Sequence, residues 1–224
     1  MKKSEAIISN LFDLEHTIAK GLFEENEYPW EILDKIGDFI MKLGPTLSED
    51  EYYHAVENVW IHKSVQAYQT ITVTGPAIIG EGTEIRPGAF IRGNVIAGKN
   101  VVMGNSCEYK NCILFDDVQT PHYNYIGDSI LGYKAHTGAA SLTSNVKSDK
   151  QHVVIHFEDE NVDTGRKKVG AMIGDYAEIG CGAVLNPGTI IGRNTNVYPL
   201  TSVRGAISAD SIVKSTAEIV AKRK

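Results

Sequence analysis

An aliphatic residue returns every six positions through most of this chain, and this repeat constrains the fold more than any other feature. It begins after the first 60 residues, often with glycine beside the aliphatic residue, at Ile61, Ala67, Val73, Ile79, Ile85, Ile91, Ala97 and Met103. After a slip near Pro121 a second series follows, at Leu131, Thr137, Ile173, Ile179, Leu185, Ile191, Val197 and Val203. A fixed short period predicts stacked units, each of which completes the core of its neighbour.

A unit of six residues has room for one very short strand and one turn. In Ile79-Gly80-Glu81-Gly82, the aliphatic residue can point inward while the glycines take backbone conformations that bulkier residues resist. Three such units close one triangular coil, and successive coils pair strand on strand in parallel. The predicted fold is therefore mainly β, a left-handed parallel β-helix over residues 61–210. Neither a sandwich nor a doubly wound sheet would produce this pattern.

The residues before the repeat have helical spacing. Apolar residues recur three or four positions apart within residues 8–18 and again within residues 30–43. Ser48 and Glu51 have the spacing of a capping box and predict a short helix that leads toward Trp60. We expect an α-helical segment over residues 1–60 that covers one end of the solenoid.

Two further segments depart from the repeat. Residues 146–170 lie between its two series, and we expect them to form an insertion loop on one face of the solenoid, built as a β-hairpin. Within this loop, Arg166-Lys167-Lys168 is either a phosphate clamp or a solvated arm of the hairpin. Residues 211–224 are expected to form a C-terminal tail.

Composition limits the classes of partner. The chain has 22 Lys and Arg against 28 Asp and Glu, for a net charge of -6, which argues against broad nucleic-acid or anionic-membrane binding. Any anion site must therefore be local. The sequence shows neither a run of 18 apolar residues nor a secretory signal pattern, so we expect a cytoplasmic protein. The three cysteines are too few and too irregular for a disulfide framework, and they are expected to be free thiols.

One stretch breaks the repeat while it stays rich in functional side chains. It contains Glu108 and Lys110, and then His122, Tyr125 and Asp128. Interruptions of a regular solenoid are where function is expected. A histidine can serve as a general base near neutral pH, and lysine and tyrosine donate hydrogen bonds that suit a phosphate. His122 alone would be an ordinary surface histidine; the group as a whole indicates a site.

These residues resemble a known family. The segments Gly104-Asn105-Ser106-Cys107-Glu108-Tyr109-Lys110, His122 with Tyr125-Ile126-Gly127-Asp128, and Thr137-Gly138-Ala139 with Asn145 are similar to the acetyltransferase half of the bifunctional N-acetylglucosamine-1-phosphate uridyltransferase/glucosamine-1-phosphate acetyltransferases. The resemblance covers roughly residues 61–208. The insertion at 164–168 is closer to the archaeal-type members than to the usual bacterial ones.

The resemblance implies an acetyl-CoA-dependent N-acetyltransferase that acts on an amino-sugar 1-phosphate. His122 would be the general base on the sugar amine, and Glu108 would contact that amine or the sugar. The sugar phosphate would be held by Arg86, Lys110 and Tyr125. The reaction would need no metal.

On the donor side, the resemblance implies contacts to the acetyl group and to coenzyme A. Asn145 would lie near the acetyl group and the sugar, and the Ala139 backbone N–H would polarise the thioester carbonyl. Cys181 and Pro199 would contact acetyl-CoA through backbone and packing. The resemblance also implies a homotrimer, because the family's members are trimers whose active sites lie between neighbouring solenoids.

This chain departs from the family in two ways. His136 stands where the family usually has a sugar-binding asparagine, and Val146 replaces a tyrosine. The acceptor could therefore be glucosamine-1-phosphate, galactosamine-1-phosphate or a nucleotide-linked amino sugar. Residues 1–60 hold no Gly-rich nucleotide-binding fingerprint, so uridylyl transfer is not expected.

Two other functions remain open from the sequence. The solenoid could keep a sugar-phosphate pocket and act as a non-catalytic binding or assembly module. It could also be a zinc enzyme of the γ-carbonic anhydrase type, which would draw its ligands from His122, His136, His152 and His156. The spacing of these histidines does not match the ligands of that class, and such a site would leave Glu108 and Lys110 unexplained.

Overall fold

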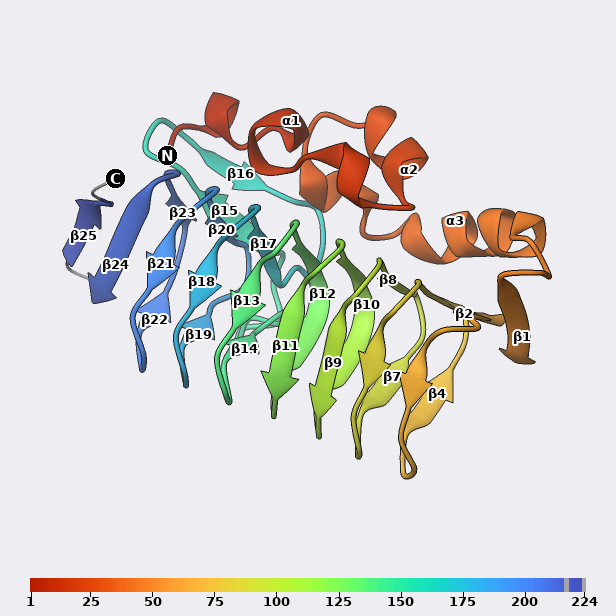
Figure 1. Ribbon diagram of the computed structural model, residues 1–224. Helices are drawn as coiled ribbons and strands as arrows, with labels where there is room; N and C mark the ends of the chain where they lie inside the picture. The colour runs from red at the N-terminus through yellow and green to blue at the C-terminus, as the bar shows by residue number, and fades with distance from the viewer. Residues whose placement is uncertain (216–217, 223–224) are drawn as a thin grey trace.

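The chain folds into a three-sided solenoid of short strands with helices along one side (Figure 1). The computed structural model describes residues 1–215 and 218–222. The first side consists of β2 (Val59–His62), β5 (Ala77–Ile79), β8 (Val95–Ala97), residues 112–114 of β10 (Glu108–Leu114), residues 129–131 of β12 (Tyr125–Leu131), β17 (Ala171–Ile173), β20 (Thr189–Ile191) and β23 (Ala206–Ile207).

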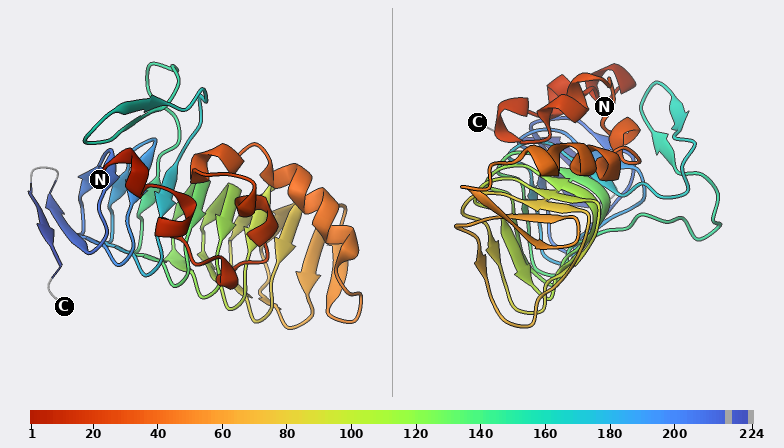
Figure 2. Two further views of the ribbon diagram at one scale, coloured as in Figure 1. Left: turned by 90° about the horizontal axis from the view of Figure 1, so that it is seen from above. Right: turned by 90° about the vertical axis from the view of Figure 1, so that its right-hand side faces the viewer.

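The second side consists of β3 (Gln66–Ala67), β6 (Glu84–Ile85), β9 (Val102–Asn105), β11 (Gln119–His122), β13 (His136–Thr137), β18 (Glu178–Ile179), β21 (Asn196–Val197) and β24 (Ser211–Ser215). The third side consists of β4 (Thr72–Thr74), β7 (Phe90–Arg92), residues 108–110 of β10, residues 125–127 of β12, β14 (Leu142–Thr143), β19 (Val184–Leu185) and β22 (Ser202–Val203). Neighbouring strands within each side are parallel, and the end view shows the triangular cross-section (Figure 2).

The aliphatic residues of the repeat form a continuous core. Ile79 pairs in register with Ala97, and Ile85 pairs with Met103, and all four are fully buried. Corners between sides are often turned by Asn or Asp at positive φ, which these residues tolerate better than most, as at Asp128 with φ 48°. The predicted mainly β solenoid is confirmed, and its left-handed sense stays a prediction.

We expected the helical segment to cover one end of the solenoid. Instead, it lies along the first side. Its α-helices are α1 (Ile8–Leu11), α2 (Lys20–Glu24) and α3 (Ile36–Leu43), and its 3-10 turns are Lys3–Glu5, Leu14–His16, Pro29–Ile32 and Gly44–Thr46. The predicted helix over residues 8–18 is thus broken into short pieces. Helix α3 contacts β5, β8 and β10 of the first side.

The predicted helix that leads toward Trp60 is wrong. The segment forms strand β1 (Tyr52–Val56), which pairs antiparallel with β2 and places Tyr53 opposite Ile61. An end coil exposes unpaired backbone groups, and a Tyr- and Val-containing segment satisfies them better as a strand than as one short helix. This hairpin therefore borders the N-terminal end of the solenoid.

The insertion forms the predicted hairpin, from β15 (Val154–His156) and β16 (Asn161–Asp163). It docks on the helical segment, where the Phe157 ring lies 6.1 Å from that of Trp30 and the Arg166 guanidinium donates to Asp34 at 2.8 Å. Arg166 is thus engaged within the chain, while Lys167 and Lys168 are exposed.

The predicted C-terminal tail contains two strands. β24 continues the second side beside β21, and β25 (Glu218–Ala221) pairs antiparallel with β24. Residues 216–217 and 223–224 of that predicted tail lie outside the described residues. None of the helices in the described ranges has the length and apolar character needed to cross a membrane.

Candidate active site

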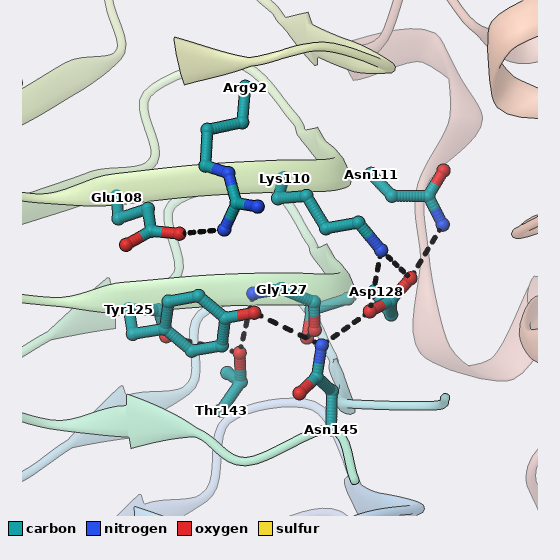
Figure 3. Close-up of polar contacts among 10 residues, drawn as sticks. Arg92, Glu108, Lys110, Asn111, Tyr125, Gly127, Asp128, Thr143 and Asn145 are labelled. Atoms are coloured by element: carbon teal, nitrogen blue, oxygen red, sulfur yellow. Dashed lines mark hydrogen bonds and ion pairs between the residues drawn. The ribbon is translucent and has the colours of Figure 1, made fainter. Parts of the chain in front are cut away.

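Four predicted site residues lie together on the outer surface of the third side (Figure 3). Glu108 and Lys110 come from β10, Tyr125 opens β12 in the next coil, and Asn145 follows β14 in the coil after that. Parallel pairing of β10 with β12 places Glu108 beside Tyr125. Side chains spread over residues 108–145 therefore meet because the coils stack in register.

Each cation of this group has a carboxylate partner. The Arg92 guanidinium pairs with Glu108, and Lys110 Nζ lies 3.0 and 3.2 Å from the two carboxylate oxygens of Asp128. Asn145 Nδ2 donates to Asp128 and, at 3.1 Å, to the Tyr125 hydroxyl. The third side thus offers two cations, a phenol and an amide, and the Arg92–Glu108 pair lies beside the hydrogen-bonded network around Asp128. We call Arg92, Glu108, Lys110, Tyr125 and Asn145 the third-side group.

The Tyr125 phenol is protonated in this setting. Burial raises the pKa of Tyr125 above its ordinary value, and the hydrogen bond from Asn145 opposes part of that increase. Because the hydroxyl accepts from Asn145, its own proton is free to be donated to a ligand. Tyr125 can therefore serve as a neutral donor to a phosphate oxygen at neutral pH.

Four of the remaining predicted residues stack in a column at the corner between the second and third sides. The Ala140 N–H donates to the His122 carbonyl, the Gly182 N–H to the Ala139 carbonyl, and the Leu200 N–H to the Cys181 carbonyl. His122, Ala139, Cys181 and Pro199 thus occupy equivalent places in four successive coils, and we call them the corner column. It adjoins the third-side group, since Tyr125 is only three residues after His122.

Two features of the corner column suit it to a ligand. Gly138 lets the coils approach closely, because a Cβ there would lie 2.6 Å from the Cys181 amide nitrogen. The side chains of His122 and Cys181 are exposed. The Ala139 N–H has no hydrogen-bond acceptor within residues 1–215 and 218–222. Cys181 therefore differs from Cys107 and Cys112, which fill core spaces as expected.

The structure does not bring Arg86 to the third-side group. Arg86 follows β6 on the second side and pairs with Glu84 at 3.0 Å, while Arg92 ends β7 on the third side beside Lys110. Lys110 follows Arg92 by eighteen residues, which is one full coil of three hexads. Arg86 lies one hexad before Arg92 and therefore falls on the preceding side. This spacing was the signal that the sequence-based choice of Arg86 missed.

His136 lies on the second side, also away from the third-side group. Its Nδ1 is 2.8 Å from a carboxylate oxygen of Glu178 in the next coil. Both side chains border a shallow cavity of about 620 Å³, together with Asn100, Asp117, Gln119 and Lys134. Within one chain, His136 and Asn145 therefore face different directions.

The histidines considered as zinc ligands are dispersed. His136 pairs with Glu178, His152 with Asp163, and His156 with Asn161, while His122 lies on the corner column. No three His, Cys, Asp or Glu side chains in the described part of the chain are grouped as metal ligands.

Comparisons with known proteins show which proteins this chain is similar to. The family described as the GMPPB C-terminal domain matches residues 73–164. The protein named bifunctional protein GlmU of Methanococcus maripaludis is 30% identical over 223 residues, which cover 92% of this chain and 50% of that protein. The bifunctional sugar-1-phosphate nucleotidylyltransferase/acetyltransferase of Sulfurisphaera tokodaii is 27% identical over 148 residues, which cover 58% of this chain and 37% of that protein.

The chain resembles the C-terminal, acetyltransferase-type half of the GlmU proteins. It spans about half the length of the curated relatives it matches. Among solved structures, PerB of Caulobacter crescentus, in complex with CoA and GDP-perosamine, is 19% identical with a TM-score of 0.36, and the match covers 79% of this chain and 61% of that one. The GlmU resemblance covers the solenoid, the third-side group and the corner column.

Proposed function

We propose that this protein is an acetyl-CoA-dependent N-acetyltransferase that acts on an amino-sugar 1-phosphate. The observation that carries the proposal is the adjacency of the third-side group, which suits a phosphorylated sugar, to the corner column, which suits a thioester. The names of the relatives, which include a sugar-1-phosphate nucleotidylyltransferase/acetyltransferase, support the same reaction class. A reaction that uses acetyl-CoA fits the cytoplasm, which is the location we propose.

In the proposed reaction, His122 acts as general base. The amine of the sugar attacks the acyl carbon of acetyl-CoA, a C–N bond forms, and the C–S bond breaks. Neutral His122 takes the proton from the amine and passes it to the departing thiolate, so that an amide and free CoA result. The Ala139 N–H would donate to the carbonyl oxygen as negative charge develops on it. Every step uses residues of the corner column and an amine held beside it.

The acceptor phosphate would be bound by Arg92, Lys110 and Tyr125. Arginine and lysine form charge-assisted hydrogen bonds to phosphate, and the protonated phenol adds a neutral donor. Glu108 is partly exposed and pairs with Arg92, so it can turn toward the sugar amine when the phosphate takes its place. Asn145 would lie nearer the acetyl group, and Cys181 and Pro199 would line the path of CoA.

The site needs a second copy of the chain if His136 takes part. His136 projects from the second side and the third-side group from another, so only a neighbouring solenoid can bring them face to face. Large apolar side chains are exposed on the third side and near its corner, namely Phe90, Leu142, Tyr123 and Leu200, and Leu200 is 85% exposed. We propose a homotrimer in which these surfaces meet, with one site at each interface.

Acceptor choice tests the proposed function. Thiol release from acetyl-CoA would be measured with glucosamine-1-phosphate, galactosamine-1-phosphate and unphosphorylated glucosamine. We expect at least one of the two phosphorylated sugars to be used at least about ten times more efficiently than glucosamine, because the phosphate engages two cations. Equal use of glucosamine and both sugar phosphates would contradict phosphate recognition. Failure of a folded protein to use any of the three would favour a binding module.

A further inference from the structure

A buried carboxylate, Asp128, connects the groups that we assign to the acceptor. Asp128 sits at the corner that ends the third side and is only 3% exposed. It accepts from Lys110 at 3.0 Å, from Asn111 at 2.9 Å, and from Asn145 (Figure 3). Its donors come from two coils other than its own, so a single side chain ties three coils together at the site.

The two ion pairs of the site differ in how readily they can open. Glu108 is 35% exposed and Arg92 is 45% exposed, so that pair can separate into solvent when a ligand arrives. The Asp128 side chain is 4% exposed, and its backbone is held as well, because its carbonyl accepts from the Gly170 N–H at 2.8 Å. Asp128 therefore stays beside Lys110 whether or not a ligand is bound.

We propose that Asp128 is a positioning residue that fixes Lys110 and Asn145 and limits how tightly Lys110 holds the acceptor phosphate. A phosphate at Lys110 must share the ammonium group with this permanent anion, which weakens its binding. The same anion holds the Asn145 amide toward the Tyr125 hydroxyl, which keeps the acetyl side of the site aligned. This inference rests on the proposed function, and it predicts opposite effects on binding and on turnover when the charge of Asp128 is removed.

The test is Asp128→Asn, which keeps the size of the side chain and removes its charge. We expect the dissociation constant for inorganic phosphate, measured by calorimetry, to fall by about 3- to 10-fold, since one nearby negative charge is lost. With the phosphorylated acceptor, kcat should fall by about tenfold while KM does not rise, because Asn145 and Lys110 lose their common anchor. A purely structural role would weaken binding and turnover together.

Asp210→Asn is the matched control. Asp210 also turns a corner at positive φ, 54° against 48° for Asp128, and it accepts from a neighbouring asparagine, Asn194, at 2.6 Å. It lies near the C-terminal end of the solenoid, away from the third-side group and from the cavity beside His136, so its variant should bind phosphate as the wild type does. If Asp128→Asn fails to show a cooperative thermal transition, Asp128→Ser carries the same test, because Ser106 already occupies such a conformation in this chain.

The phosphate measurement is independent of turnover. If the wild type uses no acceptor, the proposed function fails, and the comparison of phosphate affinities still decides the role of Asp128. A folded neutral variant that binds phosphate no more tightly than the wild type overturns the inference. Failure of both wild type and variant to bind phosphate at all also overturns it.

Discussion

Arg92 and Arg86 differ in the side of the solenoid to which they belong, and they form a matched pair for testing the site. Arg92→Ala should raise the KM for the phosphorylated acceptor by about 10- to 100-fold with a smaller change in kcat, because a charge-assisted contact to phosphate is lost. Arg86→Ala should behave almost as the wild type, since Arg86 is paired with Glu84 on the second side. Steady-state kinetics on both variants decide between the two arginines. A large rise in KM for Arg86→Ala alone would restore the assignment that the sequence suggested.

The sequence predicted which residues gather on the third side better than how their side chains are arranged. Glu108, Lys110, Tyr125 and Asn145 meet on one side because the coils keep register, which the hexad spacing implies. Arg92 was not among the predicted residues, although it precedes Lys110 by eighteen residues, which is one full coil. The role of Asp128 depends on which side chains a corner carboxylate reaches, and a linear spacing does not specify this.

At the scale of elements, the sequences of the first-side strands indicate that this side of the solenoid is covered. Strands of the first side are aliphatic at three consecutive positions, as in residues 77–79 and 95–97, and all six of these residues are fully buried. Strands buried on both faces have such continuous apolar runs. Helix α3 covers this side, whereas strands of the other two sides alternate between buried and more exposed residues, as in β6 and β7. The position of the helical segment could therefore have been predicted from the triplets.

The breaks within the helical segment could not be predicted in the same way. Its apolar spacing fits long helices, but the Asp13 N–H donates to the Asp175 carboxylate at 2.7 Å, so the chain follows the solenoid there. The Asp13 side chain accepts from Glu15 N–H and starts a 3-10 turn. The contact to Asp175 is tertiary, and it overrides local helix propensity.

The docking of the insertion hairpin should depend on pH through Asp34. The hydrogen bond from Arg166 lowers the pKa of Asp34 below its ordinary value. A carboxyl whose pKa is lower in the folded state stabilises that state above its unfolded pKa, and this stabilisation is lost as the pH falls through the folded-state pKa. We therefore expect hydrogen-exchange protection of residues 153–157 to be retained near neutral pH and to weaken below about pH 4.

Asp34→Asn tests this dependence, with Asp38→Asn on the neighbouring helix as the control. The Asp34 variant should show weaker protection of the hairpin at neutral pH and less change on acidification. The Asp38 variant should follow the wild type. Equal pH profiles for the wild type and Asp34→Asn would show that Asp34 does not hold the hairpin.

At the scale of the whole molecule, the proposed sharing of the site between chains can be tested by complementation. Lys110→Ala alters the third side and His136→Ala alters the second side, so each homotrimer alone should lose activity. In trimers formed from an equal mixture of the two variants, about one interface in four combines an unaltered third side with an unaltered second side. The mixture should therefore regain about a quarter of wild-type activity. The mixture would be prepared by co-refolding and assayed beside each variant, with light scattering to check the trimer. Activity no higher than that of the separate variants would place the site within one chain.

The central claim is that His122 removes a proton from an amine while acetyl-CoA donates its acyl group. The most direct measurement is thiol release from acetyl-CoA with the preferred sugar phosphate, for the wild type and for His122→Ala, with size and thermal unfolding checked for both. Wild-type turnover that falls by about 10²- to 10⁴-fold in a folded variant is the predicted result, as loss of a general base implies. A folded His122→Ala protein with the wild-type rate would contradict the claim.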